Sequence, residues 1–403
     1  MTNEQLEIMQ FIEEEDVKFI RLAFCDIYGV QKNISVQRDE ISRAFENGYP
    51  IDASYIDGFG GDYGEDVYLH PEADTITILP WRPEHGKVVR MFCTLCRADG
   101  TPVESDARVL LKKAVKYAKD KGYSFHFKSE MQFYLFKTDD NGDSTRIPYD
   151  NAGYMDIAPL DKGENVRREI CLTLEQMGIQ PESSHHEAGP GQNEIDFTYS
   201  DPLTSADNTV TFLSVVRTIA ARNGLYADFS PKPFSDKPGS ALHITMSVHA
   251  KNGDQVTDYA IAGMLDHIAS MTVFLNPTDR SYQRFGRLKA PKYITWSSKN
   301  RAQLIAATLT KNGNPCLQLR SPDPEANPYL AFALMIYAAV DGIEGRSELS
   351  QSTDKDIIFM NADEQKSFVL LPNSVDKARA AAYDNDFIRE TLPESIIKAY
   401  CNK

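Results

Sequence analysis

Two carboxylates flank a Gly/Pro turn near the middle of the chain. Glu187 lies shortly before the turn at 189–191 and Glu194 lies shortly after it, both in segments typical of β-strands. A hairpin would point both carboxylates into one cavity, where they repel each other unless a cation neutralises them. Carboxylate oxygens favour hard cations such as Mg²⁺ or Mn²⁺. The hairpin therefore predicts a divalent metal site.

A third acid lies inside a mostly apolar segment, Ser124–Phe136, which is typical of a β-strand. Side chains alternate along a strand, so Glu130 and Gln132 share one face with Tyr134. A carboxylate buried at this place requires a cation or hydrogen-bond donors. A strand-end acid that faces water is the alternative, and this segment alone leaves both interpretations open.

Histidines and cysteines give weaker signals for a metal. His185 and His186 are adjacent in a predicted strand, so at most one faces the acids, and we expect structural roles for both. Cys93 and Cys96 form a CxxC pair, but residues three apart in a strand point to opposite faces. No second pair accompanies them, so we expect neither a metal site nor a redox site there.

Size and charge limit the class of protein. A chain of 403 residues predicts two domains, which we place at 1–102 and 103–403. The formal net charge of −15 argues against a nucleic-acid partner, because phosphate binding needs a positive surface. No run approaches the roughly 20 apolar residues of a membrane helix. The acidic N-terminus lacks a signal-peptide pattern, so we expect a cytoplasmic protein without a membrane partner.

The order of predicted elements favours the α+β class. The first domain is β-rich, and the second opens with a helix that Ser105 caps and Gly122 ends. In the first domain we expect a helix over Asn3–Glu15, strands over Val17–Cys25, Thr75–Leu79 and Lys87–Cys96, and a loop over Ile51–Tyr68. In the second we expect helices over Val166–Met177, Leu203–Arg222, Tyr259–Leu275 and Pro328–Gly342, and strands over Ile179–His186, Asn193–Tyr199, Leu225–Phe229 and Leu242–Val248.

Several motifs follow one another in a fixed order over nearly the whole chain. They are SHHE with PGQNEIDF at 184–197, Pro231-Lys232-Pro233, His243, Asn276-Pro277-Thr278, and Arg320 followed by Asn327-Pro328-Tyr329. This combination resembles the glutamine synthetase family. The resemblance implies a small N-terminal β-grasp domain and a catalytic domain whose curved antiparallel sheet, flanked by helices, forms a funnel. It also implies homo-hexameric rings with active sites at subunit interfaces, ATP at one end of the funnel and glutamate at the other.

The same resemblance implies which residues bind metal. The family's ligand positions are retained as Glu130, Glu187, Glu194 and His243. Two further positions, glutamate in the family, are Gln132 and Gln318 here. An amide oxygen can coordinate Mg²⁺ or Mn²⁺ but brings no charge, and the lost attraction is worth several kcal/mol even at an effective dielectric of about 20. We therefore expect reduced metal occupancy.

At the family's substrate-binding and catalytic positions, this chain keeps some of the family's side chains and replaces others. The resemblance implies amino-acid binding by Gly239, Arg284 and Arg320, catalysis by Asp52, Arg284 and Arg301, and nucleotide binding by Glu182, Ser247 and Arg301. Four replacements depart from the family pattern. Ala306 and Cys316 stand where the family has two phosphate-binding arginines. Lys289 replaces a glutamate of the flap that closes over the intermediate, and Pro238 replaces an asparagine near the substrate amino group. Losing guanidinium groups weakens the grip on a transferring phosphate.

These observations leave two functions open. The first is an ATP- and Mg-dependent ligase that joins glutamate to ammonia or another amine, with its standard activity weakened or lost. The second is a pseudoenzyme, a hexameric scaffold or a metabolite-sensing regulator of nitrogen metabolism. The chain ends at Lys403, soon after a helix expected over Ser395–Tyr400, where the family continues with a helical tail. We therefore expect single hexameric rings, or rings that pair only weakly.

Overall fold

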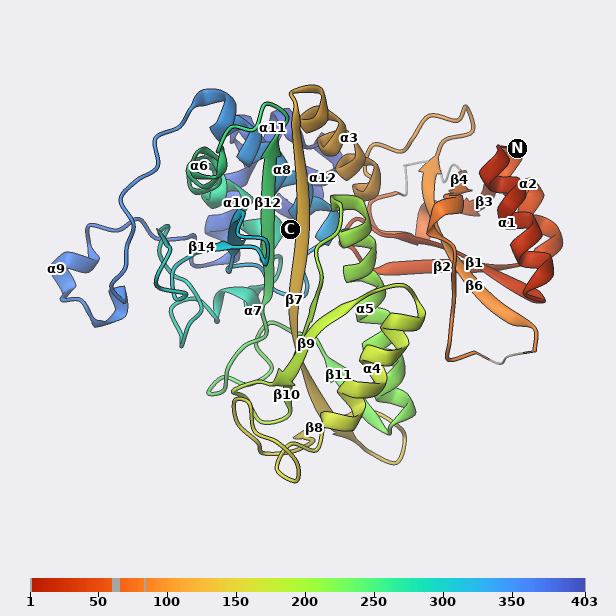
Figure 1. The fold of residues 1–403 in the computed structure, drawn as a ribbon, viewed down its shortest axis with the longest axis horizontal. Helices are drawn as coiled ribbons and strands as arrows, with labels where there is room; N and C mark the ends of the chain where they lie inside the picture. The colour runs from red at the N-terminus through yellow and green to blue at the C-terminus, as the bar shows by residue number, and fades with distance from the viewer. Residues whose placement is uncertain (1, 60–65, 83–84, 403) are drawn as a thin grey trace.

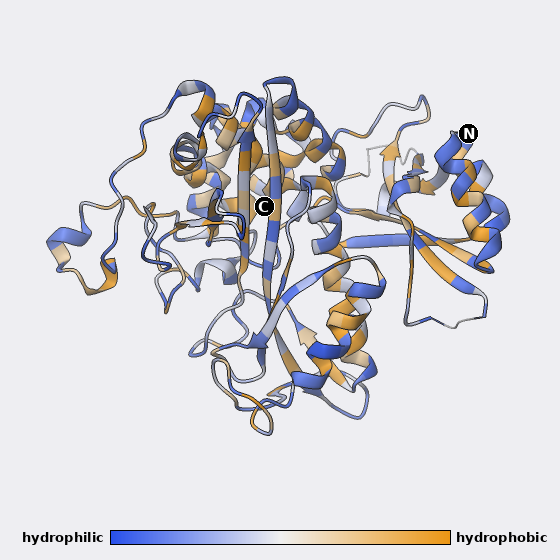
Figure 2. Cartoon of the chain, viewed as in Figure 1, coloured by the Kyte–Doolittle hydropathy of each residue, from blue (hydrophilic) through white to orange (hydrophobic). Residues whose placement is uncertain are grey.

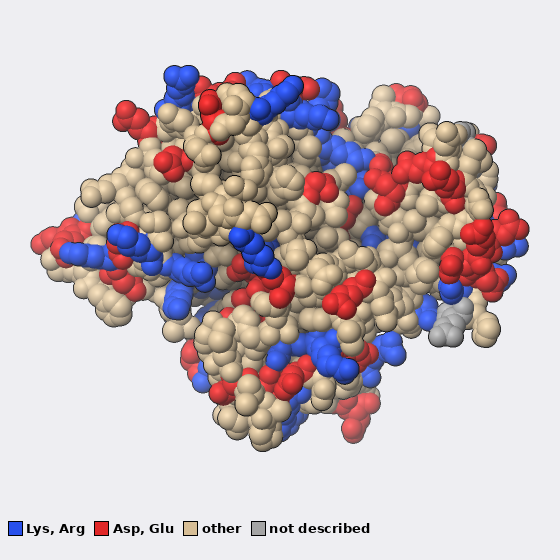
Figure 3. Space-filling view, in the orientation of Figure 1, with Lys and Arg blue, Asp and Glu red and all other residues tan. Residues whose placement is uncertain are grey.

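The computed structural model describes residues 2–59, 66–82 and 85–402, and they form two domains, each with its own sheet (Figure 1). The smaller, N-terminal domain encloses an apolar core that runs from Ile12 to Val103 in sequence. The larger domain encloses a second core in which long helices pack on a nine-stranded sheet. Figure 2 shows many hydrophobic residues along these helices and strands, and the buried positions of both cores are apolar, as packing on a sheet requires. Figure 3 shows Lys, Arg, Asp and Glu side chains spread over the outer surface of both domains.

Six strands in the order β2-β1-β6-β4-β3, with β5 beside β6, make the N-terminal sheet. The neighbours β1 and β6 run parallel, and the other pairs are antiparallel. Helices α1 and α2 lie beside it, and Thr2 and Gln5 form a capping box at the start of α1. The bounds are α1 Asn3–Glu14, β1 Val17–Cys25, β2 Gln31–Gln37, α2 Ile41–Asn47, β3 Tyr49–Asp52, β4 Asp66–Pro71, β5 Thr77–Ile78 and β6 Lys87–Cys96.

Two predictions for this domain are wrong in part. The expected loop Ile51–Tyr68 begins inside β3 and ends inside β4, because two short strands pair there despite their polar, proline-containing sequences. Residues 60–65 of that prediction lie outside the described residues. The expected strand Thr75–Leu79 is reduced to β5, because Ala73–Thr75 forms a 3₁₀ turn.

The larger sheet has the order β13-β14-β15-β12-β7-β10-β9, with β8 and β11 also paired to β7. All of its pairs are antiparallel except β13 with β14. The 16-residue strand β7 is its axis (Figure 1). The bounds are β7 Tyr123–Thr138, β8 Ser144–Pro148, β9 Pro181–His186, β10 Gln192–Phe197, β11 Leu225–Asp228, β12 Leu242–Ala250, β13 Trp296–Ser297, β14 Ile305–Leu309 and β15 Pro315–Leu319.

Helices cover this sheet and complete the domain. The predicted cap of α3 is wrong by one residue: the Asp106 carboxylate accepts hydrogen bonds from the N–H groups of Arg108 and Val109, while Ser105 Oγ donates to Gly58 O. None of the described helices is long and apolar enough to cross a membrane. The bounds are α3 Ala107–Asp120, α4 Glu164–Gln176, α5 Pro202–Arg222, α6 Thr257–Leu275, α7 Asp279–Tyr282, α8 Pro328–Gly345, α9 Ala362–Gln365, α10 Val375–Tyr383, α11 Asp386–Thr391 and α12 Glu394–Cys401.

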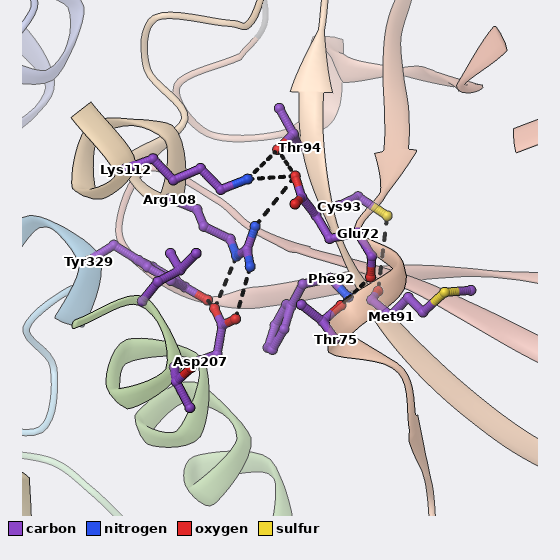
Figure 4. A network of polar contacts seen from close by, with 12 residues as sticks. Glu72, Thr75, Met91, Phe92, Cys93, Thr94, Arg108, Lys112, Asp207 and Tyr329 are labelled. Atoms are coloured by element: carbon purple, nitrogen blue, oxygen red, sulfur yellow. Dashed lines mark hydrogen bonds and ion pairs between the residues drawn. The ribbon is translucent and has the colours of Figure 1, made fainter. Parts of the chain in front are cut away.

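A buried network of ion pairs joins the two domains (Figure 4). Arg108 of α3 donates two hydrogen bonds of 3.0 Å to Asp207 of α5, and Tyr329 of α8 donates to the same carboxylate. On the N-terminal side Glu72 pairs with Lys112 at 2.6 Å and with Arg108 at 3.6 Å. The bidentate pair, which is the strong form, fixes Arg108 within the larger domain, and the pairs of Glu72 with Arg108 and Lys112 connect it to the N-terminal domain.

Candidate active site

A cavity of about 410 Å³ lies on the larger sheet, where β7, β10, β12 and β15 run side by side. Most positions singled out in the sequence line it. They are Glu130, Gln132, Glu187, Glu194, Pro238, Gly239, His243, Arg284, Lys289, Arg301, Gln318 and Arg320. Residues as far apart as 130 and 320 in sequence are brought together here by strand pairing.

Backbone register places the polar side chains opposite one another. Gln132 of β7 faces Glu194 of β10, and Glu130 faces Asp196 of the same strand. On the other side of β7, Glu130 faces His243 of β12. Residues directly opposite on antiparallel strands have neighbouring side chains. The predicted alternation along β7 and the predicted approach of Glu187 to Glu194 are both present in the structure.

Gln132 uses both ends of its amide inside the protein. Its Nε2 donates to Glu194 Oε2 at 2.7 Å, and its Oε1 accepts from the backbone N–H of Ala241 at 2.9 Å. Because only oxygen can accept from a backbone N–H, this orientation is fixed by chemistry. The side chain thus turns its NH₂ group toward the carboxylate, and a cation cannot bind to NH₂.

Gln318 has the same arrangement at the neighbouring carboxylate. Its Nε2 donates to Glu130 Oε2 at 2.9 Å and to Thr245 Oγ1 at 3.3 Å, while its Oε1 accepts from Arg320 at 2.7 Å. The arginine can only donate, so the amide oxygen again points away from the acid. Both glutamines therefore act as hydrogen-bond donors to the carboxylates Glu194 and Glu130.

A lysine that the sequence analysis did not single out lies among these acids. Lys128 Nζ is 2.5 Å from Glu182 Oε2 and 3.5 Å from Glu130 Oε1, and its side chain is 15% exposed. Lys311 binds the other oxygen of Glu182 at 2.7 Å from the solvent side. Lys128 precedes Glu130 by two residues, so the alternation that paired Glu130 with Gln132 also pointed to it. The site thus contains its own cation.

One of the two histidines faces the acids, which corrects the expectation of two structural roles. His185 Nε2 lies 3.2 Å from Glu187 Oε1 and 3.9 Å from Glu194 Oε1. His186 is structural as expected, because its buried ring bonds Asp150 at 2.9 Å and the backbone oxygen of Glu187. The predicted opposite orientation of neighbours in a strand explains the difference.

Charge balance separates two ends of the cavity. Burial would raise the pKa of Glu130, but the hydrogen bond with His243 and the charges of Lys128 and Arg320 outweigh it and lower the pKa to about 2. Burial and then the charge of Arg320 lower the pKa of His243 to about 4, so this imidazole is neutral near pH 7. Glu130 is therefore a fully compensated carboxylate.

Glu194 has too few positive neighbours. Burial, followed by the charges of Asp196 and Glu187, raises the pKa of Glu194 to about 8, and the hydrogen bond from Gln132 only reduces that rise. A carboxylate in this state binds either a proton or a cation. Ligand atoms of His185, Glu187 and Glu194 lie within 4.8 Å of one another. This half of the cavity can therefore hold one divalent cation.

Three arginines also line the cavity. Arg284 is 3% exposed and donates to the backbone oxygens of Ser321 and Pro322, and Arg320 is 9% exposed. Arg301 is exposed at the rim. Gly239 lies so close that an added Cβ would be 2.4 Å from Pro231 O and 2.7 Å from Arg284 Cγ. Only glycine fits beside this arginine.

Five of the predicted positions do not line this cavity. Asp52 is exposed on the N-terminal domain, where its carboxylate accepts hydrogen bonds from the N–H and the hydroxyl of Ser54, and Glu182 reaches the site only through Lys128. Ser247 is buried in β12. Ala306 faces Gln318 across β14 and β15, and Cys316 faces Thr308, with Sγ 3.1 Å from its hydroxyl. The CxxC pair, Cys93 and Cys96, consists of free buried thiols whose pKa values are raised by burial.

Comparison with known proteins gives one consistent answer over both domains. Residues 16–98 match the family described as "Glutamine synthetase, beta-Grasp domain", and residues 104–403 match "Glutamine synthetase, catalytic domain". The chain is 40% identical to a glutamine synthetase of Clostridium saccharobutylicum over 409 residues, covering 98% of this chain and 92% of that protein. A glutamine synthetase of Staphylococcus epidermidis is 39% identical over 412 residues, with the same coverage.

Solved structures agree with the sequences. The structure described as "GmaS/ADP complex-Conformation 1" superimposes with a TM-score of 0.87 at 25% identity, covering 98% of this chain and 94% of that chain. Apo GmaS superimposes with a TM-score of 0.86 at 26% identity, covering 98% and 93%. The N-terminal β-grasp domain and the curved sheet with flanking helices, expected from the sequence, are thus confirmed.

Proposed function

This chain belongs to the glutamine synthetase family, and from that premise we propose that it is a glutamine synthetase-like carboxylate–amine ligase whose ATP- and metal-dependent activity is weakened or lost. The observation that carries the proposal is the pair of glutamines that donate to Glu130 and Glu194, together with Lys128 beside them. In this arrangement amide NH₂ groups occupy one oxygen of each acid, and Lys128 compensates the charge of Glu130.

Of two metal positions, the residues fit one. His185, Glu187 and Glu194 offer close donor atoms with excess negative charge, as Mg²⁺ or Mn²⁺ requires. Around Glu130 and His243 the fit is poor, because Lys128 already compensates the carboxylate and Gln318 presents its NH₂ group. A metal-bound triphosphate, which needs both positions, would bind weakly here.

The amino-acid end supports retained substrate binding. Arg320 is a buried guanidinium group whose Nε has no hydrogen-bond partner among the described residues, a setting suited to the carboxylate of an amino acid. Arg284, beside the glycine-only wall at Gly239, already lies 3.7 Å from Asp323 and would add its charge to the same end. Arg301 at the rim is suited to an anionic group that enters from solvent. Glu182 and Ser247 would lie on the nucleotide side, and Asp52 would act in the active site of a neighbouring subunit of a homo-hexameric ring. When bound, ATP supplies the phosphoryl group that activates the acid.

A second candidate follows from the same contacts. If the cavity binds an amino acid but no nucleotide, the protein is a non-catalytic pseudoenzyme, a hexameric scaffold or metabolite sensor of nitrogen metabolism. The arginine end of the cavity favours it, because Arg284 and Arg320 need no metal to bind a carboxylate. Binding without turnover is the property that separates this function from a ligase.

Two measurements test these candidates together. Calorimetric titration with Mg²⁺-ATP and, separately, with glutamate gives the affinity of each end of the cavity. Phosphate release from ATP, with glutamate and a panel of amines, gives turnover. We expect weak nucleotide binding and little or no phosphate release. Micromolar Mg²⁺-ATP affinity together with rapid phosphate release would contradict the proposal, and glutamate binding alone would favour the sensor.

Restoring charge should restore nucleotide binding. The variant Gln132→Glu with Gln318→Glu returns two carboxylates, and Ala306→Arg with Cys316→Arg returns two guanidinium groups. We expect at least about tenfold tighter Mg²⁺-ATP binding in the fourfold variant, equal to about 1.4 kcal/mol. The matched control places the same four groups at exposed positions, as Gln37→Glu, Gln176→Glu, Ala221→Arg and Ala380→Arg. Equal effects of the control and the fourfold variant would refute the role of these positions.

A further inference from the structure

A second and larger cavity, about 820 Å³, lies between the two domains beside α5 and away from the residues of the candidate active site. Its walls come from β1, β2 and β6 of the N-terminal domain and from α5 and β11 of the larger domain. None of the acids of the candidate active site lines it. Its chemistry is therefore independent of the site described above.

Two arginines stand side by side on its N-terminal wall. Arg21 of β1 is the register partner of Arg90 on the neighbouring strand β6. Like charges directly opposite in a sheet repel each other. Arg90 is only 7% exposed, and Arg90 NH1 and Arg21 Nε have no hydrogen-bond partner among the described residues. Burial lowers the pKa of both, in Arg90 to about 10.

A third arginine faces them from the larger domain. Arg217 of α5 packs over the ring of Phe229 at 5.1 Å, and within the described chain it forms no ion pair. Two acids line the cavity, but the Asp228 carboxylate accepts from Ser230 and the Glu325 carboxylate accepts from Thr278. Among the described residues no acid lies within ion-pair distance of these three arginines, and the charges of Asp207 and Asp228 act on Arg90 and Arg217 only from farther away.

Arg108 is a buried arginine that, unlike Arg90, has acidic partners. Its guanidinium lies near the same Phe92 ring as that of Arg90, at 5.8 Å against 3.9 Å, yet Arg108 has Asp207 and Glu72 as partners (Figure 4). Of the three arginines Arg90 is buried, Arg21 is half-buried and Arg217 is exposed. A buried charge without a partner is costly, so Arg90 beside a cavity indicates that its partner comes from outside.

We propose that this cavity binds a small organic dianion, with Arg21 and Arg90 holding one anionic group and Arg217 holding the other. Trp81 and Leu79 supply an apolar wall for a short carbon skeleton between the two anionic groups. Carboxylates and phosphate monoesters are the anions that guanidinium groups bind best. Because the arginines come from both domains, the bound dianion ties the domains together at a second place.

Calorimetry and thermal unfolding of the full chain test this proposal. Succinate, glutarate and adipate are probes whose two carboxylates are increasingly far apart, and inorganic phosphate and AMP are the phosphate probes. Each is compared with chloride at equal ionic strength. We expect saturable binding of at least one probe and a rise in melting temperature. Arg90→Met and Arg217→Met should each weaken that binding at least tenfold, while the exposed control Arg38→Met leaves it unchanged.

A second readout does not depend on choosing the right probe. Without ligand, Arg90→Met removes an unpaired buried charge, so we expect its melting temperature to equal or exceed that of the wild type. A clear fall in melting temperature would overturn the proposal, because it would show that Arg90 is a structural residue. The absence of saturable binding by all five probes, or equal binding by the Arg90→Met variant, would overturn it too. So would a loss of oligomer mass in that variant by light scattering, which would assign the cavity to a contact between copies of this chain.

Discussion

The domain junction around Arg108 and the candidate active site around Glu130 and Glu194, here called the funnel, both contain buried charged groups. The two regions compensate these charges differently. At the junction Arg108 meets Asp207 and Glu72, and each charge has an opposite charge within 4 Å. In the funnel two carboxylates face neutral amides, and one lysine serves both Glu130 and Glu182. The junction needs no further ligand, whereas the funnel retains negative charge around Glu194 that a proton or cation can satisfy.

The largest effect is expected at the junction. Asp207→Asn leaves Arg108 buried without its main partner, and breaking a buried pair in this way costs about 3–5 kcal/mol. Thermal unfolding should show a large drop in melting temperature. The matched control Asp120→Asn breaks an exposed pair with Lys116 and should cost less than about 1 kcal/mol. If both variants lose the same stability, the Arg108–Asp207 pair contributes no more than an exposed pair does.

A smaller effect is expected from the pH dependence of the metal-free protein. Glu194 has a folded pKa of about 8 against an ordinary value of 4.5. Between these values the folded state keeps a proton that the unfolded chain has lost, so stability present at low pH falls as the pH rises. From pH 6.5 to 8 this loss amounts to about 2 kcal/mol.

The raised pKa values of His185 and His186 act in the same direction, since their stabilisation is also lost on going to higher pH. Melting temperatures measured in chelator across this range give the slope. Glu194→Gln should remove most of it, and Glu344→Gln, at an exposed acid outside the funnel, should leave it intact. A flat profile for the wild type would contradict the charge imbalance in the funnel.

The smallest effect is expected from the resident cation. Lys128→Met leaves Glu130 and Glu182 without their shared ammonium, so Mn²⁺ should bind at least about tenfold more tightly, equal to about 1.4 kcal/mol. Mn²⁺ titration followed by electron paramagnetic resonance measures this directly. Lys311→Met is the matched control, because its ammonium contacts Glu182 from solvent, and we expect less than a twofold change. Unchanged affinity in Lys128→Met would show that the lysine does not compete with metal.

The sequence alone predicted the parts of the site that depend on local periodicity. Alternation placed Glu130 and Gln132 on one face, and the Gly/Pro turn brought Glu187 to Glu194. Lys128 obeys the same alternation, but a lysine is usually solvent-exposed, and only its contact with Glu182 across the sheet makes it part of the site.

Other features depend on contacts that no local pattern encodes. Ser105 and Asp106 are both good N-caps, and the bond from Ser105 to Gly58 in the other domain decides which one caps α3. The unpaired state of Arg90 depends on which acids other elements bring near, so it becomes visible only once both domains are assembled. The local sequence pattern predicts which side chains share a strand face and where the chain turns. The hydrogen-bond and ion-pair partners of those side chains are known only from the tertiary structure.

The 16-residue strand β7 pairs with β8, β10, β11 and β12, and it carries Lys128, Glu130 and Gln132 along one edge of the cavity. A backbone locked to four neighbours opens only when the whole sheet opens. Its amide protons should therefore be among the slowest to exchange with deuterated water. Ligand binding would then move side chains while the backbone of β7 stays in place. Hydrogen–deuterium exchange measured by mass spectrometry should therefore change in the surrounding loops and not in this strand.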